Sequence, residues 1–280
     1  MKNIIDAIST LVRLDDNRLS GDHSGSNRIN AVGYALEDYI KNLFADGFNC
    51  SERERREKWS ATFSYLGNDA NPPDIILKGG DAIEVKKIQS DNAALALNSS
   101  YPKQILSRDN PLLSKACREA EDWSEKDIIY AVGVVSGSRI KSLCMIYGRD
   151  YCASSDCYDR IRRSIKNGVE TSAGLEFAPT RELGRVNRVD PLGITYLRIR
   201  GMWHIENPWK VFGYVYRRNA RAAFNFMCLI DADKWFGLEN RGALLELQKN
   251  YPSLQLADVR IHDPDNPARL NDAKLISYEF

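Results

Sequence analysis

Two stretches near the N-terminus carry apolar residues at helical spacing. Isoleucine, leucine, valine and tyrosine recur every three or four positions over residues 4–14 and again over residues 28–44. This period places the apolar side chains on one face, so each stretch predicts an amphipathic α-helix. The polar stretch over residues 15–27 predicts the loop between them, and Gly47 marks the end of the second helix. A mixed-charge run over residues 51–58 predicts a solvated helix face.

Runs of β-branched residues bounded by glycines predict strands farther along the chain. Residues 74–88 read as two short strands around a glycine turn, which is a strong hairpin signal. Further strands are predicted over residues 128–135, 143–147, 194–199, 211–216 and 224–230, and helices over residues 111–123, 158–166 and 238–249. No internal repeat, low-complexity tract or clear linker interrupts this pattern. The sequence therefore predicts a single α/β domain over residues 1–280 with a strand-rich C-terminal half.

Composition narrows the class of protein. Hydrophobic residues make up 43% of the 280 positions and charged residues 28%, a balance typical of soluble globular proteins. No apolar run approaches the roughly 18 residues of a membrane-spanning helix. The N-terminus also lacks the apolar core of a signal peptide. We therefore expect a cytoplasmic protein with no membrane partner.

The spacing of cysteine and histidine argues against a zinc site. The six cysteines contain no CxxC pair, and the three histidines lie far apart. Free thiols in a reducing compartment are the better interpretation. The chain also lacks the GxxxxGK[ST] loop and the glycine fingerprint of nucleotide-binding folds. We therefore expect no organic cofactor.

The side chains of the 74–88 hairpin indicate its register. A two-residue turn would mix apolar and charged groups on each face, whereas a three-residue turn over residues 79–81 separates them, because opposed residues of an antiparallel pair share a face. This second register predicts the pairs Leu77–Ile83, Ile76–Glu84, Ile75–Val85 and Asp74–Lys86. One face is then apolar, and the other carries Asp74, Glu84 and Lys86 together.

Two carboxylates and a lysine at one strand end suit the hydrolysis of a phosphodiester. Asp74 and Glu84 offer the hard oxygen ligands that Mg²⁺ prefers, and a bound ion lowers the pKa of its water and neutralises charge on the phosphate. Lys86 would orient the attacking water and offset developing negative charge. Val85 contributes its backbone carbonyl at most, since its side chain points to the core. The alternative is an ordinary exposed hairpin face, with a surface ion pair worth roughly 0–1 kcal/mol.

Glu37 lies on the polar side of the predicted helix that precedes the hairpin. It is a candidate for a further metal ligand, or for holding a water that ligates the metal. Asp38 is the neighbouring alternative. A glutamate on a helix is more often simply solvated, so both interpretations stay open. Asp81, in the predicted turn, lies at the wrong end of the strands.

Pro73-Asp74 followed by Glu84-Val85-Lys86 resembles the motif of the PD-(D/E)xK nuclease superfamily. A longer set of segments resembles the NgoPII-type family of type II restriction endonucleases, over residues 27–28, 35–40, 72–87, 96–103 and 109–118. This resemblance implies a restriction-endonuclease-like mixed central β-sheet flanked by helices, with one or two Mg²⁺ ions per active site. It also implies double-strand cleavage by a homodimer at a short palindromic DNA site, for which the family's best-known target is GGCC.

Two groups of residues are candidates for binding double-stranded DNA. The segment past the catalytic strand offers short hydrogen-bonding side chains and a cation, namely Asn98, Ser99, Ser100, Tyr101 and Lys103, with Arg108 as a phosphate contact. The alternative is a loop that caps the following helix. Arg217, Arg218 and Arg221 close a predicted strand end, and arginine is well suited to read guanine in a GC-rich site. A solvated basic face is the alternative for these arginines.

Trp203 and Trp209 suggest a stacking platform for unpaired bases. Aromatic residues among strands are more often part of the core, and we favour that interpretation.

Two competing functions follow from the same residues. A structure- or damage-directed nuclease would use the same scaffold, and sequence-specific cleavage of intact duplex separates it from a restriction enzyme. A non-catalytic DNA-binding protein is the alternative from another class. Such a protein would not need Asp74, Glu84 and Lys86 together on one face.

Overall fold

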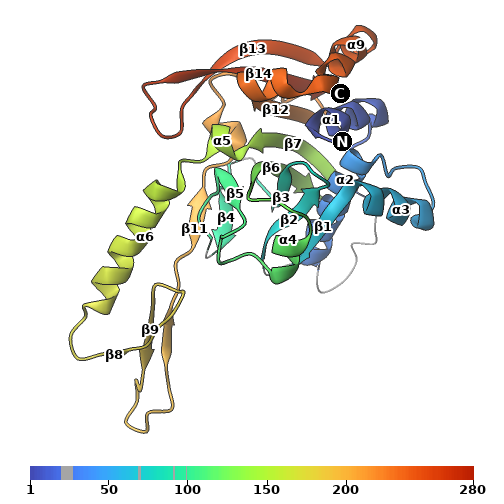
Figure 1. Ribbon diagram of the computed structural model, residues 1–280. Helices are drawn as coiled ribbons and strands as arrows, with labels where there is room; N and C mark the ends of the chain where they lie inside the picture. Colours follow the sequence, from blue (N-terminus) through green and yellow to red (C-terminus); the bar gives the residue numbers. More distant parts are fainter. Residues whose placement is uncertain (20–27, 69–70, 91, 99) are drawn as a thin grey trace.

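A mixed β-sheet forms the centre of the fold (Figure 1). The computed structural model describes residues 1–19, 28–68, 71–90, 92–98 and 100–280. The strands follow the order β1-β2-β3-β6-β7-β12-β14-β13, with β5 paired to the start of β6. Their bounds are β1 Phe63–Asn68, β2 Asn71–Leu77, β3 Ala82–Ile88, β5 Ile105–Ser107, β6 Glu125–Ser136, β7 Arg139–Tyr147, β12 Asn225–Asp231, β13 Gln255–His262 and β14 Leu270–Glu279.

The directions of the strands confirm the mixed sheet. The β3–β6 and β7–β12 pairs are parallel, and the other neighbours are antiparallel. The two parallel pairs lie in the middle of the sheet, where both faces are covered, as parallel strands require.

Long helices cover one face of this sheet. Helices α1 (Ile4–Leu14) and α2 (Arg28–Ala45) match the two predicted amphipathic stretches almost residue for residue. Their apolar faces join one core cluster with the odd-numbered residues of β3 and β6. The same core is flanked by α3 (Glu52–Thr62), α8 (Ala232–Gly237), the 3-10 helix η1 (Glu239–Arg241) and α9 (Gly242–Asn250).

Gly133 on β6 lets α2 approach the sheet closely. A Cβ at this position would meet the side chain of Leu36 at 2.8 Å. Gly133 pairs with Lys87 of β3, so α2 crosses the sheet beside β3. Glu37, the next residue on the helix, is thereby held near that strand.

Short elements cover the opposite face. These are β4 (Leu95–Asn98), β11 (Trp203–Ile205), α4 (Lys115–Glu119), α5 (Gly148–Tyr151) and α7 (Pro208–Val211). No helix within the described ranges is long and apolar enough to cross a membrane.

Three predicted elements differ from the structure. The helix predicted over residues 111–123 is reduced to α4, and the strand predicted over residues 194–199 is reduced to β10 (Leu197–Ile199). The strand predicted over residues 211–216 is wrong, because Asn207 caps α7 and Pro208 begins it. The chain then continues in a turn that ends near residue 216.

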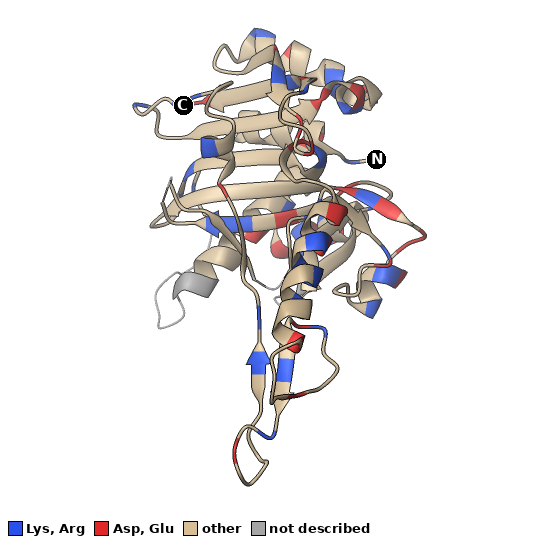
Figure 2. Ribbon diagram, turned by 90° about the vertical axis from the view of Figure 1, so that its left-hand side faces the viewer, with Lys and Arg blue, Asp and Glu red and all other residues tan. Residues whose placement is uncertain are grey.

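An arm projects from the body of the molecule (Figures 1 and 2). It consists of α6 (Ser155–Glu170), β8 (Glu176–Phe177), β9 (Gly184–Asn187) and β10, and the three strands form a small antiparallel sheet. No residue of α6 is buried, although the helix has 16 residues. The predicted basic helix over residues 158–166 is therefore an exposed element of this arm.

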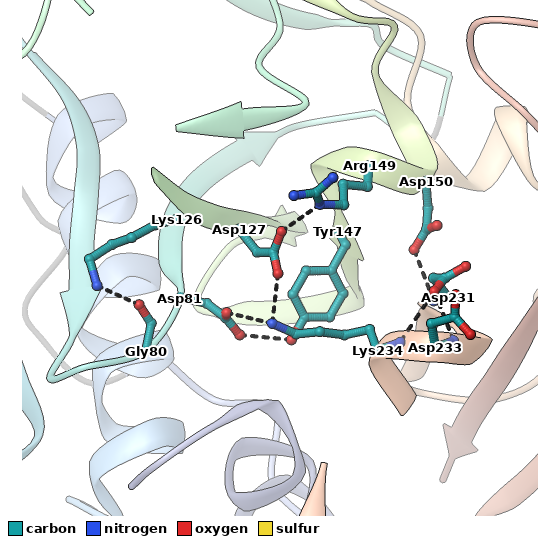
Figure 3. A network of polar contacts seen from close by, with 10 residues as sticks. All are labelled: Gly80, Asp81, Lys126, Asp127, Tyr147, Arg149, Asp150, Asp231, Asp233 and Lys234. Atoms are coloured by element: carbon teal, nitrogen blue, oxygen red, sulfur yellow. Dashed lines mark hydrogen bonds and ion pairs between the residues drawn. The ribbon is translucent and has the colours of Figure 1, made fainter. Parts of the chain in front are cut away.

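Lys234 on α8 joins the hairpin end of β3 to β6 (Figure 3). Its ammonium donates to Asp81 Oδ1 and to Asp127 Oδ2, each at 2.8 Å. Tyr147 Oη donates to Asp81 Oδ2 at 2.8 Å, and Arg149 Nε donates to Asp127 Oδ1 at 2.7 Å. Burial lowers the pKa of Lys234, but the two carboxylates outweigh it and hold that pKa above its usual value.

We expect the substitution Lys234→Met to lower the free energy of unfolding by about 2–4 kcal/mol, because it leaves two buried or half-buried carboxylates without their shared cation. Urea denaturation at neutral pH measures this. Lys249→Met is the matched control, since Lys249 and its partner Glu246 have side chains 67% and 73% exposed and such pairs contribute about 0–1 kcal/mol. Equal unfolding free energies in the two variants would contradict the role given to Lys234.

Candidate active site

The β2–β3 hairpin has a different register from the predicted one. Its ladder consists of the pairs Ile75–Ile83 and Ile76–Ala82, and the Leu77 N–H donates to the Asp81 carbonyl at 3.0 Å. The turn therefore spans residues 78–80 instead of 79–81. The predicted register is wrong by two residues, and the same alignment places Asp74 level with Glu84 instead of Lys86.

A shift of two residues keeps each side chain on its predicted face, because side chains alternate with a period of two. Ile75 and Ile83 belong to the core cluster under α1 and α2, and Val85 packs against it. Asp74, Glu84 and Lys86 therefore share the opposite face, as the sequence predicted from a different register.

Where the backbone ladder between β2 and β3 ends, the Asp74 side chain accepts the next hydrogen bond from β3. Asp74 Oδ2 accepts a hydrogen bond from the Val85 N–H at 2.7 Å. The N–H and C=O of one strand residue point to the same side of the strand. The Val85 carbonyl therefore faces the same side as Asp74, where it can serve as an oxygen ligand.

Glu84 has one satisfied and one unsatisfied carboxylate oxygen. Oε1 accepts a hydrogen bond from Lys86 Nζ at 2.6 Å, whereas Oε2 is buried with no hydrogen-bond partner among the described residues. A buried acceptor without a partner costs free energy, so it marks a position for a ligand. With Asp74 and the Val85 carbonyl it offers the hard oxygen donors that fit Mg²⁺.

Burial and like charge shift the protonation of this site. Burial raises the pKa of Asp74 to about 7, with a further contribution from the charge of Glu84. Lys86 and the Val85 N–H oppose this rise but do not cancel it. Burial lowers the pKa of Lys86, yet the carboxylates of Glu84 and Asp74 outweigh it, so Lys86 stays charged. The two carboxylates thus repel each other, and a bound cation would relieve this repulsion.

Glu37 lies at the border of the site. Its charge acts on Asp74 and Lys86, more weakly than that of Glu84. Its Oε1 pairs with Lys41 Nζ at 2.7 Å. Asp38 pairs with the same lysine at 3.2 Å, and its side chain is 55% exposed. Within the described ranges, no group of three or more carboxylate, histidine or cysteine side chains is spaced to hold a metal ion.

Lys103 is close enough to Glu84 for the charge of that carboxylate to act on it, and its burial was not predicted. The residue is 7% exposed. Its Nζ donates to Ser100 Oγ, and the charges of Glu84 and Lys86 both act on it. Burial lowers its pKa. Ser99 and the Asn98 side chain, predicted to bind DNA with it, lie outside the described residues.

Tyr101 belongs to an aromatic cluster at the base of the arm. Its ring stacks on Tyr158 at 5.4 Å between centroids and meets Trp203 edge-on at 6.1 Å. Its hydroxyl donates to Asp159 Oδ2 at 3.3 Å. These contacts fasten α6 to the body. Trp209, only 7% exposed, lies in the core as favoured from the sequence.

The predicted arginine contacts lie at opposite ends of the sheet. Arg218 lies over the Trp209 ring at 5.3 Å and donates to Ser142 Oγ at 3.5 Å. Ser142 pairs with Val134, and Val134 pairs with the last residue of β3. Arg218 therefore lies at the C-terminal end of β3, the end nearer to Lys86. Arg217 and Arg221 are exposed beside it. Arg108 follows β5 at the other end, 3.8 Å from Asp122.

We expect Asp74→Asn to stabilise the metal-free protein at about pH 8 by roughly 1–4 kcal/mol, because each pH unit of pKa displacement is worth about 1.4 kcal/mol. The raised pKa of Asp74 means that the folded protein holds this proton more tightly than the unfolded chain. The free energy of unfolding therefore falls as pH rises from about 4 to about 7. Asparagine keeps an oxygen acceptor for the Val85 N–H.

Urea denaturation in a chelator, at about pH 8 and about pH 5, tests this sign. The gain should shrink at the lower pH, where Asp74 is mostly protonated in the folded protein. A variant that is less stable than the wild type at about pH 8 would contradict it.

Comparison with known proteins identifies the family of the chain. The family model for the NgoPII restriction endonuclease matches residues 2–262. Type II restriction enzyme NgoPII from Neisseria gonorrhoeae is 54% identical over 282 residues, which cover 99% of this chain and 100% of that protein. No solved structure matches the chain. With the family model spanning nearly its whole length and a relative this similar, the chain belongs to the NgoPII restriction endonuclease family.

Proposed function

We propose that this chain is a type II restriction endonuclease that makes Mg²⁺-dependent double-strand cuts at a short palindromic DNA site. Its family is one of restriction endonucleases. The observation that carries the metal dependence is the buried Glu84 Oε2, which has no partner among the described residues and lies beside Asp74.

The residues of β2 and β3 divide the chemistry. Asp74, Glu84 and the Val85 carbonyl would hold one or two Mg²⁺ ions, which when bound activate a water molecule and neutralise charge on the phosphate. Lys86 Nζ, fixed by Glu84 Oε1 at 2.6 Å, orients the attacking water and offsets the charge that develops on the phosphate oxygens. Glu37 holds a water of the site from α2 in this proposal.

DNA reaches this site along the sheet edge where β3 ends. The exposed Arg217 and Arg221, with Arg218 between them, are proposed to bind there, and a GC-rich, GGCC-like target suits arginines that read guanine. Ser100 would lie near the scissile phosphate. Arg108, at the other end of the sheet, would contact phosphate at most.

The compartment in this proposal is the cytoplasm. All six cysteines of the chain are free thiols, and four of them are buried. Free thiols are usual in a reducing compartment.

We also propose that the enzyme acts as a homodimer, since each strand of a palindromic site then meets one active site. The arm supports this proposal because it exposes large apolar side chains, among them Ile161, Ile165, Leu192 and Ile194. Exposed apolar groups of this density usually mark an interaction surface.

In sedimentation experiments we expect a mass near twice the 31.7 kDa of the chain. The double variant Ile161→Asp, Ile165→Asp should shift the protein toward monomer, because it places charges on the exposed apolar face of α6. Leu245→Asp is the control, since Leu245 is 51% exposed on α9. A wild-type protein that is monomeric at micromolar concentration, both free and on DNA, would contradict the proposed homodimer.

Cleavage of plasmid DNA tests the activity directly. We expect discrete fragments with Mg²⁺, none in EDTA, and a loss of at least about 100-fold in rate for Glu84→Ala, because one metal ligand and the partner of Lys86 are removed together. Mapping of the fragment ends then gives the target sequence. Glu246→Ala, on the exposed face of α9, is the matched control.

Other outcomes point to the competing functions. Nicks or smears without a fixed position would indicate a structure- or damage-directed nuclease. Duplex binding without cleavage in Mg²⁺ or Mn²⁺ would indicate a DNA-binding protein without catalysis.

A further inference from the structure

Lys103 is a buried cation without a carboxylate partner. It is 7% exposed, and within the described ranges the one hydrogen bond of its ammonium goes to the neutral hydroxyl of Ser100. An ammonium has three donors, and burying a charge without a paired anion costs several kcal/mol. Lys103 therefore carries a free-energy cost of burial that a lysine on the surface does not carry.

The backbone of Lys103 is fixed beside the catalytic strand. Its N–H donates to Tyr130 Oη at 2.7 Å, and Tyr130 Oη donates to its carbonyl at 3.3 Å. Tyr130 is 2% exposed and pairs with Glu84 across the β3–β6 ladder. Gly148 lets the same loop pack closely against α5, because a Cβ at this position would clash with the Lys103 carbonyl.

The loop lies beside Glu84, because Tyr130, which binds the Lys103 backbone, is paired with Glu84 on the neighbouring strand. Glu84 and Lys86 are the catalytic groups whose charges act on Lys103. The charge of Glu84 therefore acts on two lysines, Lys86 from β3 and Lys103 from the loop after β4. Lys86 is already paired with Glu84, whereas two donors of Lys103 remain for an anion that arrives with the substrate.

We propose that Lys103 is a second catalytic lysine, whose ammonium binds a non-bridging oxygen of the scissile phosphate. The inference rests on the proposed function. It gives Lys103 a role different from that of a surface cation, because a buried donor aimed at the reacting phosphate stabilises charge that develops in the transition state. The phosphate supplies the anion that the loop lacks.

The test compares Lys103→Met with the control Lys115→Met, whose side chain is 84% exposed on α4. We expect Lys103→Met to slow single-turnover cleavage by about 100- to 1,000-fold, as for the removal of one donor from a preorganised site. Lys115→Met should cleave as the wild type does. Lys103→Gln repeats the test with a neutral polar side chain in case the methionine variant does not fold.

A sulfur substitution identifies the atom that Lys103 contacts. The scissile phosphate is prepared with sulfur at one or the other non-bridging position. At one of the two, sulfur should slow the wild type and Lys115→Met, but should slow Lys103→Met much less, because the contact is already gone. A second measurement needs no catalysis: in EDTA, the slope of log affinity for duplex against log salt should fall by about 0.9 in Lys103→Met.

The outcomes separate this inference from the proposed function. If the wild type cuts and Lys103→Met cuts at the same rate, the inference is overturned and the proposed function stands. If Lys103→Met is slow but keeps the full sulfur effect at both positions, Lys103 acts through the fold, and the inference is again overturned. If the wild type does not cut while it still binds duplex, the proposed function fails first.

Discussion

The burial of two carboxylates side by side is the constraint on which the rest of the structure depends. Asp74 and Glu84 lie level on neighbouring strands, and their mutual repulsion adds to the cost of burial. The surrounding groups reduce that cost without removing it: Val85 gives one backbone N–H and Lys86 one ammonium. What remains is a buried Glu84 carboxylate oxygen that has no hydrogen-bond partner among the described residues, and this is where the proposed Mg²⁺ would find a hard oxygen ligand.

Residues of β6 position the groups that surround this carboxylate pair on both faces of the sheet. On one face Gly133 admits α2, which brings Glu37 to the border of the site. On the other face Tyr130 fixes the loop that carries Lys103. At the turn end, Lys234 binds Asp81 to Asp127 and so joins the hairpin to the C-terminal part of the chain. The hairpin is therefore fixed at the turn and left open only where Asp74 replaces the ladder.

The spacing of apolar residues predicted which side chains share a face of a helix or strand. It did not predict the strand register or the placement of loops. The residues of the charged hairpin face were predicted correctly although the predicted register was wrong by two residues, because a two-residue shift keeps each side chain on the same face. Helices α1 and α2 were predicted because their apolar spacing is regular. The strand predicted over residues 211–216 failed because a capping Asn207 before Pro208 outweighs a short apolar run. The burial of Lys103 has no local signal, since it arises from a loop crossing a strand more than 25 residues away.

Lys41, Lys86 and Lys103 are paired to different degrees, and the roles proposed for them follow this order. Lys41 contacts two carboxylates, Glu37 and Asp38, and its charge is satisfied within the helix. Lys86 forms an ion pair with one carboxylate among the described residues, that of Glu84, and is held beside it. Lys103 contacts only a hydroxyl among the described residues, so its charge is the least compensated of the three. A phosphate entering the site would be drawn most strongly to the cation that has no anion of its own, because its field is the least cancelled by a neighbouring carboxylate.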